Sequence, residues 1–393
     1  MNVKTFIKKY TMVIALVVVF IFFAWWTEQR LLYPQNLSNL LIQNAYVLVL
    51  ACGMLMCILT GGNIDLSVGS TVCFIGAIAA QMLTKHNLNP IVVILLCLVF
   101  SCLIGMWQGF WIGYVHIPPF ICTLAGMFLF RGFGRAILES KTIAIPQSDG
   151  TVGKKFLDIF TSYIEVPGVD TADKKWSAFI LGIIIAVALI AVTVLKRVKK
   201  AKKGYKQESA ISQFGKILVI DALVLAYTWK LSLYKGIPVM AIWVLAVVGI
   251  YAFITSKTAF GRHFYAVGGN EKATKLSGIN TKMVYFMAYT SMSVLAGLSG
   301  LLVAARVGSV NGDTGNSFEM DAIGSCFIGG ASAYGGSGTV GGVMVGAILL
   351  GVINQGMSIK GLDNNWQYVV KGGVLLVAVI FDVVSNKKTG KAG

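Results

Sequence analysis

The sequence TAFGRHFYAVGGNEKATKLSGIN, at Thr258–Asn280, is a polar and basic island in a chain that is otherwise mostly apolar. Long apolar runs flank it at Ile237–Thr255 and Met283–Ala305. A connection between two membrane spans needs only a few residues to reverse direction, whereas this one has 23. The length of the island therefore predicts a structured element that projects from a membrane.

The island carries the signals of a short helix. Gly268-Gly269 predicts a turn, and Asn270 is a good helix N-cap. Glu271 would lie at the positive end of this helix, and Gly278 would end it in the left-handed conformation. About two turns of helix fit between cap and stop, at 3.6 residues per turn. The pattern predicts a cytosolic docking helix; a solvated basic loop is the alternative.

Composition places the chain in a membrane. Of 393 residues, 56% are hydrophobic and 12% are charged, whereas soluble domains contain about 25% charged residues. Apolar runs long enough to cross a bilayer predict an all-α polytopic membrane protein with about 10 to 12 transmembrane helices. The twelve candidate spans, of which 216–233 and 321–336 are the weakest, are 11–27, 42–60, 66–84, 90–113, 119–138, 177–195, 216–233, 238–256, 283–306, 321–336, 338–357 and 366–384.

The basic residues indicate the orientation, because cytoplasmic loops are enriched in lysine and arginine. With both termini in the cytoplasm, the basic loop 196–206, the island and the basic tail 387–391 all face inward. The one long outer loop, 139–176, nearly balances its charges. The net charge of +17 is thus explained by the inner membrane face and does not indicate nucleic acid.

Two segments share a faint internal repeat. Asp65–Ala77 reads DLSVGSTVCFIGA, and Asp321–Gly330 reads DAIGSCFIGG. In the predicted orientation the first heads outward and the second inward, as in an inverted-topology repeat, whose interface forms the pathway in many transporters. We expect repeats at 42–138 and 283–384 around an insert at 139–256. Chance similarity between glycine-rich apolar segments is the alternative.

Polar residues within apolar runs are costly in lipid and mark a candidate pathway. The segment GGNIDLSVGS, at 61–70, breaks an apolar run, which predicts a broken or re-entrant helix against protein or a water-filled cavity. Asp65 is expected to cap the helix that follows. Arg131 and Lys371 lie deep in their spans at matched places in the repeats. The candidate pathway residues are Asn63, Asp65, Ser67, Ser70, Asp321, Ser325, Asn354, Gln355 and Lys371.

The chain lacks the usual signatures of catalysis. Its seven cysteines fall in apolar runs without metal-ligand spacing, which predicts buried thiols and neither disulfides nor a metal site. The glycine-rich run at 335–342 lacks the lysine of a phosphate-binding loop. We therefore expect no enzyme activity and no cofactor, and any ATP hydrolysis would belong to another chain.

Four stretches closely resemble the membrane permeases of bacterial ribose-, xylose- and galactose-type ABC importers. They are GGNIDLSVGS at 61–70, PPFICTLAGMFLFRG at 118–132, the island at 258–280, and FEMDAIGSCFIGGASAYGGSGTVGG at 318–342. The resemblance covers nearly the whole chain and is greatest to the xylose and multiple-monosaccharide branch. The spans within 177–256 exceed the ten-span pattern of smaller relatives.

The resemblance implies a bacterial cytoplasmic membrane permease that works as a pair. Its partners would be a cytosolic two-cassette ATPase and an extracytoplasmic sugar-binding protein, in a setting of membrane lipid. It also implies that 268–280, within the coupling loop 257–282, contains the helix that sits in a groove of the ATPase. The predicted coupling residues are Gly261, Arg262, Gly268, Gly269, Asn270, Glu271, Ala273, Leu276 and Gly278.

The expected function is import of monosaccharides of the xylose, galactose, arabinose or ribose type. The alternative is an ion-coupled secondary transporter of small polar solutes. Such a carrier would need the intramembrane charges of Asp65, Asp221, Asp321 and Lys371. A docking helix in the cytosol is not required by an ion-coupled carrier, and this favours the importer.

Overall fold

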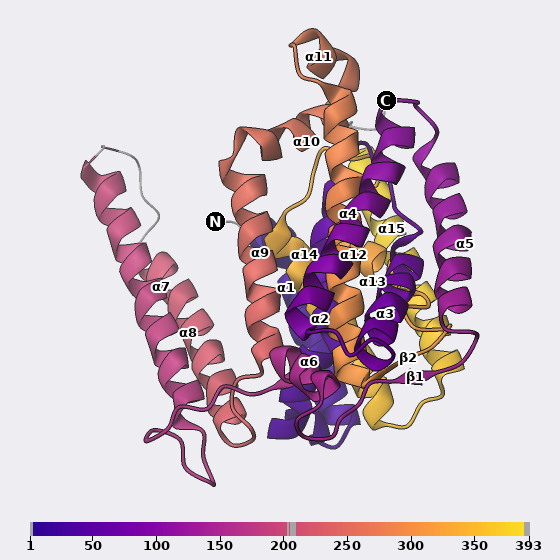
Figure 1. Cartoon of the computed structure of the whole chain (residues 1–393). Coiled ribbons are helices and arrows are strands. Elements are labelled where there is room, and N and C mark those ends of the chain that lie inside the picture. Colours follow the sequence, from indigo (N-terminus) through magenta and orange to yellow (C-terminus); the bar gives the residue numbers. More distant parts are fainter. Residues whose placement is uncertain (1–2, 203, 205–209, 389–393) are drawn as a thin grey trace.

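The computed structural model describes residues 3–202, 204 and 210–388, and these ranges are almost entirely helical (Figure 1). The helices are α1 (Val3–Trp26), α2 (Pro34–Leu59), α3 (Val68–Thr84), α4 (Pro90–Gly113), α5 (Pro119–Ile137), α6 (Val152–Thr161), α7 (Trp176–Lys202), α8 (Ala210–Ser232), α9 (Val239–Lys257), α10 (Ala259–Gly269), α11 (Glu271–Leu276), α12 (Thr281–Val307), α13 (Phe318–Ile328), α14 (Val340–Ile359) and α15 (Asn364–Lys388). A short 3-10 turn, η1 (Arg30–Leu32), precedes α2. Two short antiparallel strands, β1 (Ile143–Ala144) and β2 (Ser309–Val310), pair at the end of the bundle opposite α11.

Long apolar helices make the chain an all-α polytopic membrane protein. Within the described ranges, seven helices are long and apolar enough to cross a membrane: α2, α4, α5, α7, α9, α12 and α14. They correspond to seven of the twelve predicted spans. The predicted spans 11–27, 66–84 and 366–384 lie in α1, α3 and α15, whose apolar stretches are shorter, and 216–233 lies in α8.

The predicted span at 321–336 is wrong. The chain there forms α13, which has 11 residues and ends at Ile328. At 1.5 Å per residue this helix is about 16 Å long, roughly half of the hydrocarbon core. Residues 329–339 have no helix and include Gly330 and Gly335 with positive φ. Glycines that favour a broken backbone look apolar in a hydropathy window, which explains the error.

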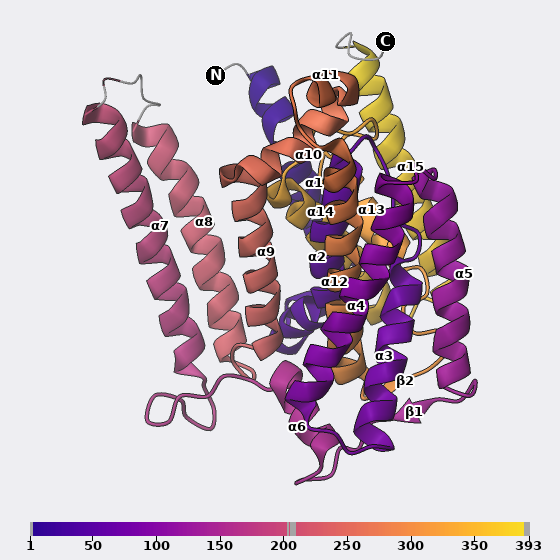
Figure 2. The same cartoon turned by 45° about the horizontal axis from the view of Figure 1, so that its top comes forward.

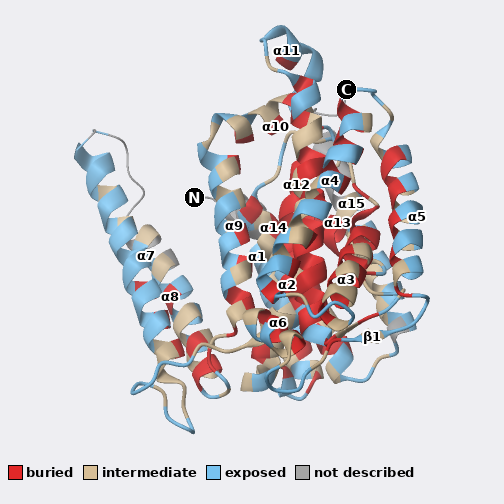
Figure 3. Ribbon diagram, in the orientation of Figure 1, coloured by how far each residue is buried: buried red, intermediate tan, exposed pale blue. Residues whose placement is uncertain are grey.

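The core sits around α2 and α12, which pack against each other and carry most of the largest fully buried side chains (Figure 3). The surrounding helices turn apolar side chains outward, for example Phe128 on α5 and Leu245 on α9, which are 67% and 66% exposed. Apolar surface of this kind is costly in water and suits lipid chains. The buried centre and the apolar rim together match a bundle that spans a bilayer.

Two non-helical segments meet inside the bundle. Residues 61–67 separate α2 from α3, as the break in GGNIDLSVGS predicts, and residues 329–339 separate α13 from α14. The Gly336 amide donates a 3.1 Å hydrogen bond to the Leu59 carbonyl. A Cβ on Gly62, whose φ is +76°, would lie 1.9 Å from the Ala333 carbonyl oxygen. The two breaks therefore contact each other through backbone.

The helix pair α7–α8 stands at the side of the bundle and packs mainly on itself, with α8 also contacting α2 (Figure 2). Gly182 on α7 allows close approach, because a Cβ there would lie 2.1 Å from Oγ1 of Thr228 on α8. The first turn of α1, the last turn of α15 and the free end of the pair all lie at the same end of the bundle as α11.

Candidate functional site

The helix α11 projects beyond the end of the bundle (Figure 1). Its N-cap is Asn270, whose side chain accepts a 2.9 Å hydrogen bond from the Ala273 amide. The helix ends at Leu276, and Gly278 follows with φ of +84°. The sequence predictions of the cap and the glycine stop are confirmed. Leu276 is 90% exposed, so α11 presents an apolar side chain to whatever lies outside the bundle.

The turn predicted at Gly268-Gly269 is wrong, because both glycines form the last residues of α10. The Thr258 hydroxyl caps α10 by accepting a 2.9 Å hydrogen bond from the Gly261 amide, and the helix runs uninterrupted to Gly269. Gly261 is buried against the end of α9, where a Cβ would lie 2.0 Å from the Ile254 carbonyl oxygen. Arg262 is exposed on the same helix. Gly261 and Gly268 thus serve close packing, whereas Gly269 is exposed and simply ends the helix.

The helix α10 rests directly on the junction of the two broken segments. A Cβ on Gly268 would lie 1.8 Å from the Leu59 carbonyl oxygen and 2.5 Å from the Gly336 nitrogen. One turn earlier, the Tyr265 hydroxyl donates a 2.9 Å hydrogen bond to the Gly338 carbonyl. Burial raises the pKa of the Tyr265 phenol, which keeps it protonated as a donor. The element that carries α11 is thus in contact with both breaks.

A polar network organises the first break. Oδ1 of Asp65 accepts hydrogen bonds from the Ser67 amide at 2.8 Å and from the Ser67 hydroxyl at 2.6 Å. The Ser67 hydroxyl in turn accepts a 2.7 Å bond from Nε2 of Gln108 on α4. The bond to the Ser67 amide closes a turn before α3. The predicted role of Asp65 as the cap of α3 is wrong, because the N-cap is Ser67, and no side-chain hydrogen bond caps the helix. Asn63 closes the preceding turn by donating to the Thr60 carbonyl at 3.1 Å.

The second carboxylate, Asp321, lies in the first turn of α13 and is 2% exposed. Lys371 on α15 contacts both of its oxygens, at 2.9 and 3.0 Å. The Tyr46 hydroxyl on α2 donates to the same carboxylate at 2.8 Å, and its ring stacks on Phe318 at 3.8 Å between centroids. The short helix is thereby held from α15 and from α2.

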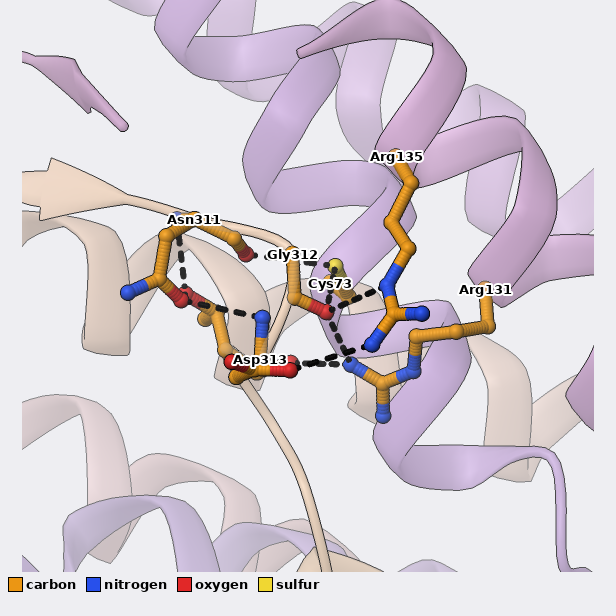
Figure 4. A network of polar contacts seen from close by, with 7 residues as sticks. Cys73, Arg131, Arg135, Asn311, Gly312 and Asp313 are labelled. Atoms are coloured by element: carbon orange, nitrogen blue, oxygen red, sulfur yellow. Dashed lines mark hydrogen bonds and ion pairs between the residues drawn. The ribbon is translucent and has the colours of Figure 1, made fainter. Parts of the chain in front are cut away.

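Two arginines on α5 hold the loop that enters α13 (Figure 4). Arg131 donates to the carbonyls of Gly312 and Thr314, at 3.2 and 2.7 Å. Arg135 donates to the Gly312 carbonyl at 3.4 Å and pairs with Asp313 at 3.1 Å. Arg131 and Lys371 thus both bind at the start of α13. Arg135 is exposed, and it nevertheless has partners within the protein, because it binds this loop.

The remaining predicted pathway residues are mostly enclosed. Ser70 on α3 and Ser325 on α13 are at most 1% exposed, and the Ser325 hydroxyl donates to the Asp321 carbonyl at 2.6 Å. On α14, Asn354 is half-buried and Gln355 is buried. Within the described residues no hydrogen bond joins the Asp65 network to Asp321. The structure therefore gathers the predicted pathway residues into separate groups.

A cavity of about 110 Å³ opens beside the Asp321–Lys371 pair. It lies between α13, α14 and α15, and its walls include Ser317, Tyr368 and the apolar side chain of Leu350. Small residues let these helices approach, since a Cβ on Gly346 of α14 would lie 2.2 Å from the Ser325 carbonyl. A Cβ on Gly342 would likewise lie 2.3 Å from the Gly329 carbonyl oxygen, so two small residues four apart on α14 allow close approach.

Sequence reasoning missed Tyr46 and Asp313 as partners of these charges. Tyr46 lies in an apolar run, where nothing local distinguishes it from a packing tyrosine. Asp313 lies in the polar loop NGDTGNS at 311–317, whose hydrophilic composition between α12 and α13 was an available signal. Within the described residues no group of His, Cys, Asp or Glu is placed to hold a metal ion.

A helical membrane bundle with two backbone breaks, charges paired around a half-length helix and an exposed helix beyond one end has the architecture of the membrane component of a transport system. The chain belongs to the family described as branched-chain amino acid transport system / permease component, whose model matches residues 36–379. It is accordingly a transport permease subunit and not an enzyme.

Individual relatives agree with the family. The chain is 35% identical over 385 residues to the xylose transport system permease protein XylH of Haemophilus influenzae, covering 97% of this chain and 98% of the relative. It is 33% identical over 387 residues to XylH of Escherichia coli K12, covering 98% and 93%. The ribose import permease protein RbsC of Bacillus subtilis is 30% identical over 351 residues, covering 89% and 85%. No solved structure matches the chain significantly.

Proposed function

We propose that this chain is the membrane permease of an ATP-driven importer that brings monosaccharides into the bacterial cell. The substrate class follows from relatives named for xylose, ribose and galactose transport. The proposed partners are a second copy of the permease, a cytosolic two-cassette ATPase and an extracytoplasmic sugar-binding protein. The similarity to the two xylose permeases makes xylose the first sugar to test.

The observation that carries the proposal is the geometry of α11. It is a rigid, capped helix outside the bundle, with Leu276 exposed at its end and Glu271 tied to the Tyr285 hydroxyl at 3.0 Å. Exposed apolar side chains on an ordered element mark contact surfaces. The proposed coupling residues therefore divide into two groups. Asn270, Glu271, Ala273, Leu276 and Gly278 form the contact helix, and Gly261, Arg262, Gly268 and Gly269 belong to the helix that supports it.

The contact of α10 with the two breaks supports a route from ATPase to pathway. When the ATPase moves α11, α10 moves with it, because Asn270 alone separates the two helices. Gly268 and Tyr265 then press on the backbone at Leu59, Gly336 and Gly338. Backbone that lacks helical hydrogen bonds yields more readily than a helix, so the breaks are the expected hinges.

The packing pattern supports the proposed inverted repeat of 42–138 and 283–384 around the insert 139–256. In one half α3 packs on α12 and α5, and α4 packs on α12. In the other half α13 packs on α2 and α15, and α14 packs on α2. Exchanging α2 with α12 turns one set of contacts into the other. The proposed pathway lies between these halves, along 42–84 and 321–357. Its lining residues become accessible to solute when the halves separate.

We propose the orientation that the basic loops predict, in which both termini and α11 lie in the cytoplasm. The pairing of Asp321 favours ATP coupling over ion coupling. An ion-coupled carrier needs an acidic group that takes up and releases a cation, whereas Asp321 is already paired with Lys371.

Reconstitution tests the proposal directly. The permease, its ATPase and its binding protein are placed in liposomes with ATP on the ATPase side, and uptake of radiolabelled xylose, ribose and galactose is measured. We expect uptake of at least one sugar that requires ATP and binding protein. Uptake that follows a proton or sodium gradient without ATP would overturn the proposal.

A further inference from the structure

The pair α7–α8 is long enough to cross the hydrocarbon core of a bilayer, and its two ends carry different kinds of residue. At one end Lys174 lies over the rings of Trp176 and Trp229, at 5.4 Å from each centroid. Aromatic side chains of this type favour the headgroup level of a bilayer. At the other end Lys196 begins a basic run, 20 residues after Trp176. Twenty helical residues span about 30 Å, the thickness of the hydrocarbon core.

The basic run ends α7 with several cations on a continuous exposed surface. Lys196, Lys199, Lys200 and Lys202 are exposed, and none has an acidic partner among the described residues. Arg197 differs, because it turns toward α8 and donates to Oε1 of Gln213 at 2.9 Å. The four lysines, named here the α7 lysine cluster, therefore form an uncompensated positive surface at the level of the bilayer headgroups.

The faces next to the α7 lysine cluster are apolar and uncovered. On α8, Leu218 is 72% and Leu223 64% exposed, and on α7, Leu195 and Val187 are each 59% exposed. Apolar side chains at these positions require hydrocarbon or another protein against them. The element thus combines exposed apolar walls with cations at one end, which is the pattern of an amphiphile with an acyl chain and an anionic head.

We propose that the free end of the α7–α8 pair is a binding site for anionic phospholipid. The acyl chains lie along the exposed apolar faces of α7 and α8, and the phosphate groups contact the α7 lysine cluster. Clusters of four or more basic residues next to a membrane span attract anionic lipids, while neutral lipids lack the charge complement. A second copy of the permease fits less well, because it would bring the same positive cluster to the contact.

The test measures lipid contact at one position of the full-length permease. A fluorophore is attached at Leu218→Cys, after the native cysteines have been replaced, and the protein is reconstituted in phosphatidylcholine vesicles. Quenching is then compared between spin-labelled phosphatidylglycerol and spin-labelled phosphatidylcholine. We expect the anionic lipid to be preferred. The preference should fall at least about fivefold in the K196Q/K199Q/K200Q/K202Q variant, the factor contributed by one surface cation near an anionic membrane.

The matched control, K141Q/K154Q/K155Q/K235Q, removes four lysines from the opposite end of the bundle and should keep the preference for anionic lipid. An unchanged preference in the first variant, or an equal loss in the control, overturns the proposal. Absence of quenching by either lipid would show that protein covers this face, and would also overturn it. Inorganic phosphate at constant ionic strength should not remove the preference; if it does, the site binds a free anion and not a lipid.

Discussion

Lys371 contacts both carboxylate oxygens of Asp321, at 2.9 and 3.0 Å, and so ties α15 to the half-length helix α13. The Tyr46 hydroxyl adds a third contact from α2. Because α13 is too short to cross the bilayer, it relies on such side-chain contacts for its position. We infer that the Asp321–Lys371 pair holds α13 in the conformation described here.

The Asp321–Lys371 pair gives the first prediction. Lys371→Met leaves the buried Asp321 carboxylate without its cation, which typically costs about 3–5 kcal/mol. Adding Asp321→Asn removes the stranded charge and should recover a large part of that loss. Thermal unfolding of the purified single and double variants measures the difference. Equal stability of the native and Lys371→Met proteins would show that the pair does not hold α13.

The stop of α11 gives the second prediction. Gly278 has φ of +84° in open space, so Gly278→Val is strained by its backbone and not by contacts. We expect sugar uptake and transport-coupled ATP hydrolysis to fall while membrane insertion is retained. Gly168 has φ of +83° in the outer loop, also in open space, and Gly168→Val is the matched control. Normal coupled hydrolysis in Gly278→Val would exclude α11 as the docking element.

The seat of α10 gives the third prediction. The added methyl group in Gly268→Ala would meet the Leu59 carbonyl at 1.8 Å, whereas Gly269→Ala meets nothing within 4 Å. The first substitution should displace α10 and reduce ATP-driven uptake at least about tenfold, since a shift of about 1.4 kcal/mol is enough for that factor. The neighbouring substitution should leave uptake unchanged. Uptake assays on both variants in the same vesicles decide the matter, and identical rates would refute the proposed route.

The Asp65 network gives the fourth prediction. Asp65→Asn keeps an oxygen that accepts from the Ser67 amide, whereas Asp65→Leu leaves that buried donor unpaired at a cost of about 1–3 kcal/mol. The Asn variant should transport almost normally, and the Leu variant should be less stable and transport poorly. Melting temperature and uptake are the readouts. Equal loss of transport in both would indicate that the charge itself is required and would support ion coupling.

The two buried serines give the fifth prediction. Ser70→Cys and Ser325→Cys, in a protein without native cysteines, should be unreactive toward a water-soluble thiol reagent in the present conformation, because both sites are enclosed. They should become reactive when the nucleotide state of the ATPase changes, since alternating access separates the repeats. Ile180→Cys and Val377→Cys face outward on apolar helices and should remain inert in lipid. Inert serine positions in every state, with uptake intact, would exclude this pathway.

The sequence was informative about several features that depend on neighbours along the chain, although the turn expected at Gly268-Gly269 is the end of a helix. The Asn270 cap, the Gly278 stop and the break at 61–67 follow from local backbone preferences, and all three are present. Hydropathy did not distinguish the end of α13 from a longer span, because the glycine-rich loop at 329–339 has no charged residue that would mark it as a loop. The partnership of Tyr46 and Asp321 joins residues 275 positions apart, and no local pattern records it.

The class of importer was easier to recognise from the sequence than the contacts of the candidate site were. Several long motifs resembled one family, and the family match over residues 36–379 confirms that resemblance. The roles of Arg131 and Lys371 were only suggested by their matched positions. Arg131 binds the loop before α13 and Lys371 binds Asp321 within it, and both contacts depend on packing between distant helices, which spacing along the chain does not determine.

The joint where α10 meets the two breaks is made almost wholly of main chain, from the carbonyl of Leu59 to the amide of Gly336. Apart from the Tyr265 hydroxyl, which donates to the Gly338 carbonyl, the contacts named here join main-chain atoms, and any residue larger than glycine at 268 collides with them. On the proposal that this contact carries motion from the ATPase, permeases built on this plan can diverge in the solutes they carry, through side chains elsewhere in the bundle, while the contact itself stays the same.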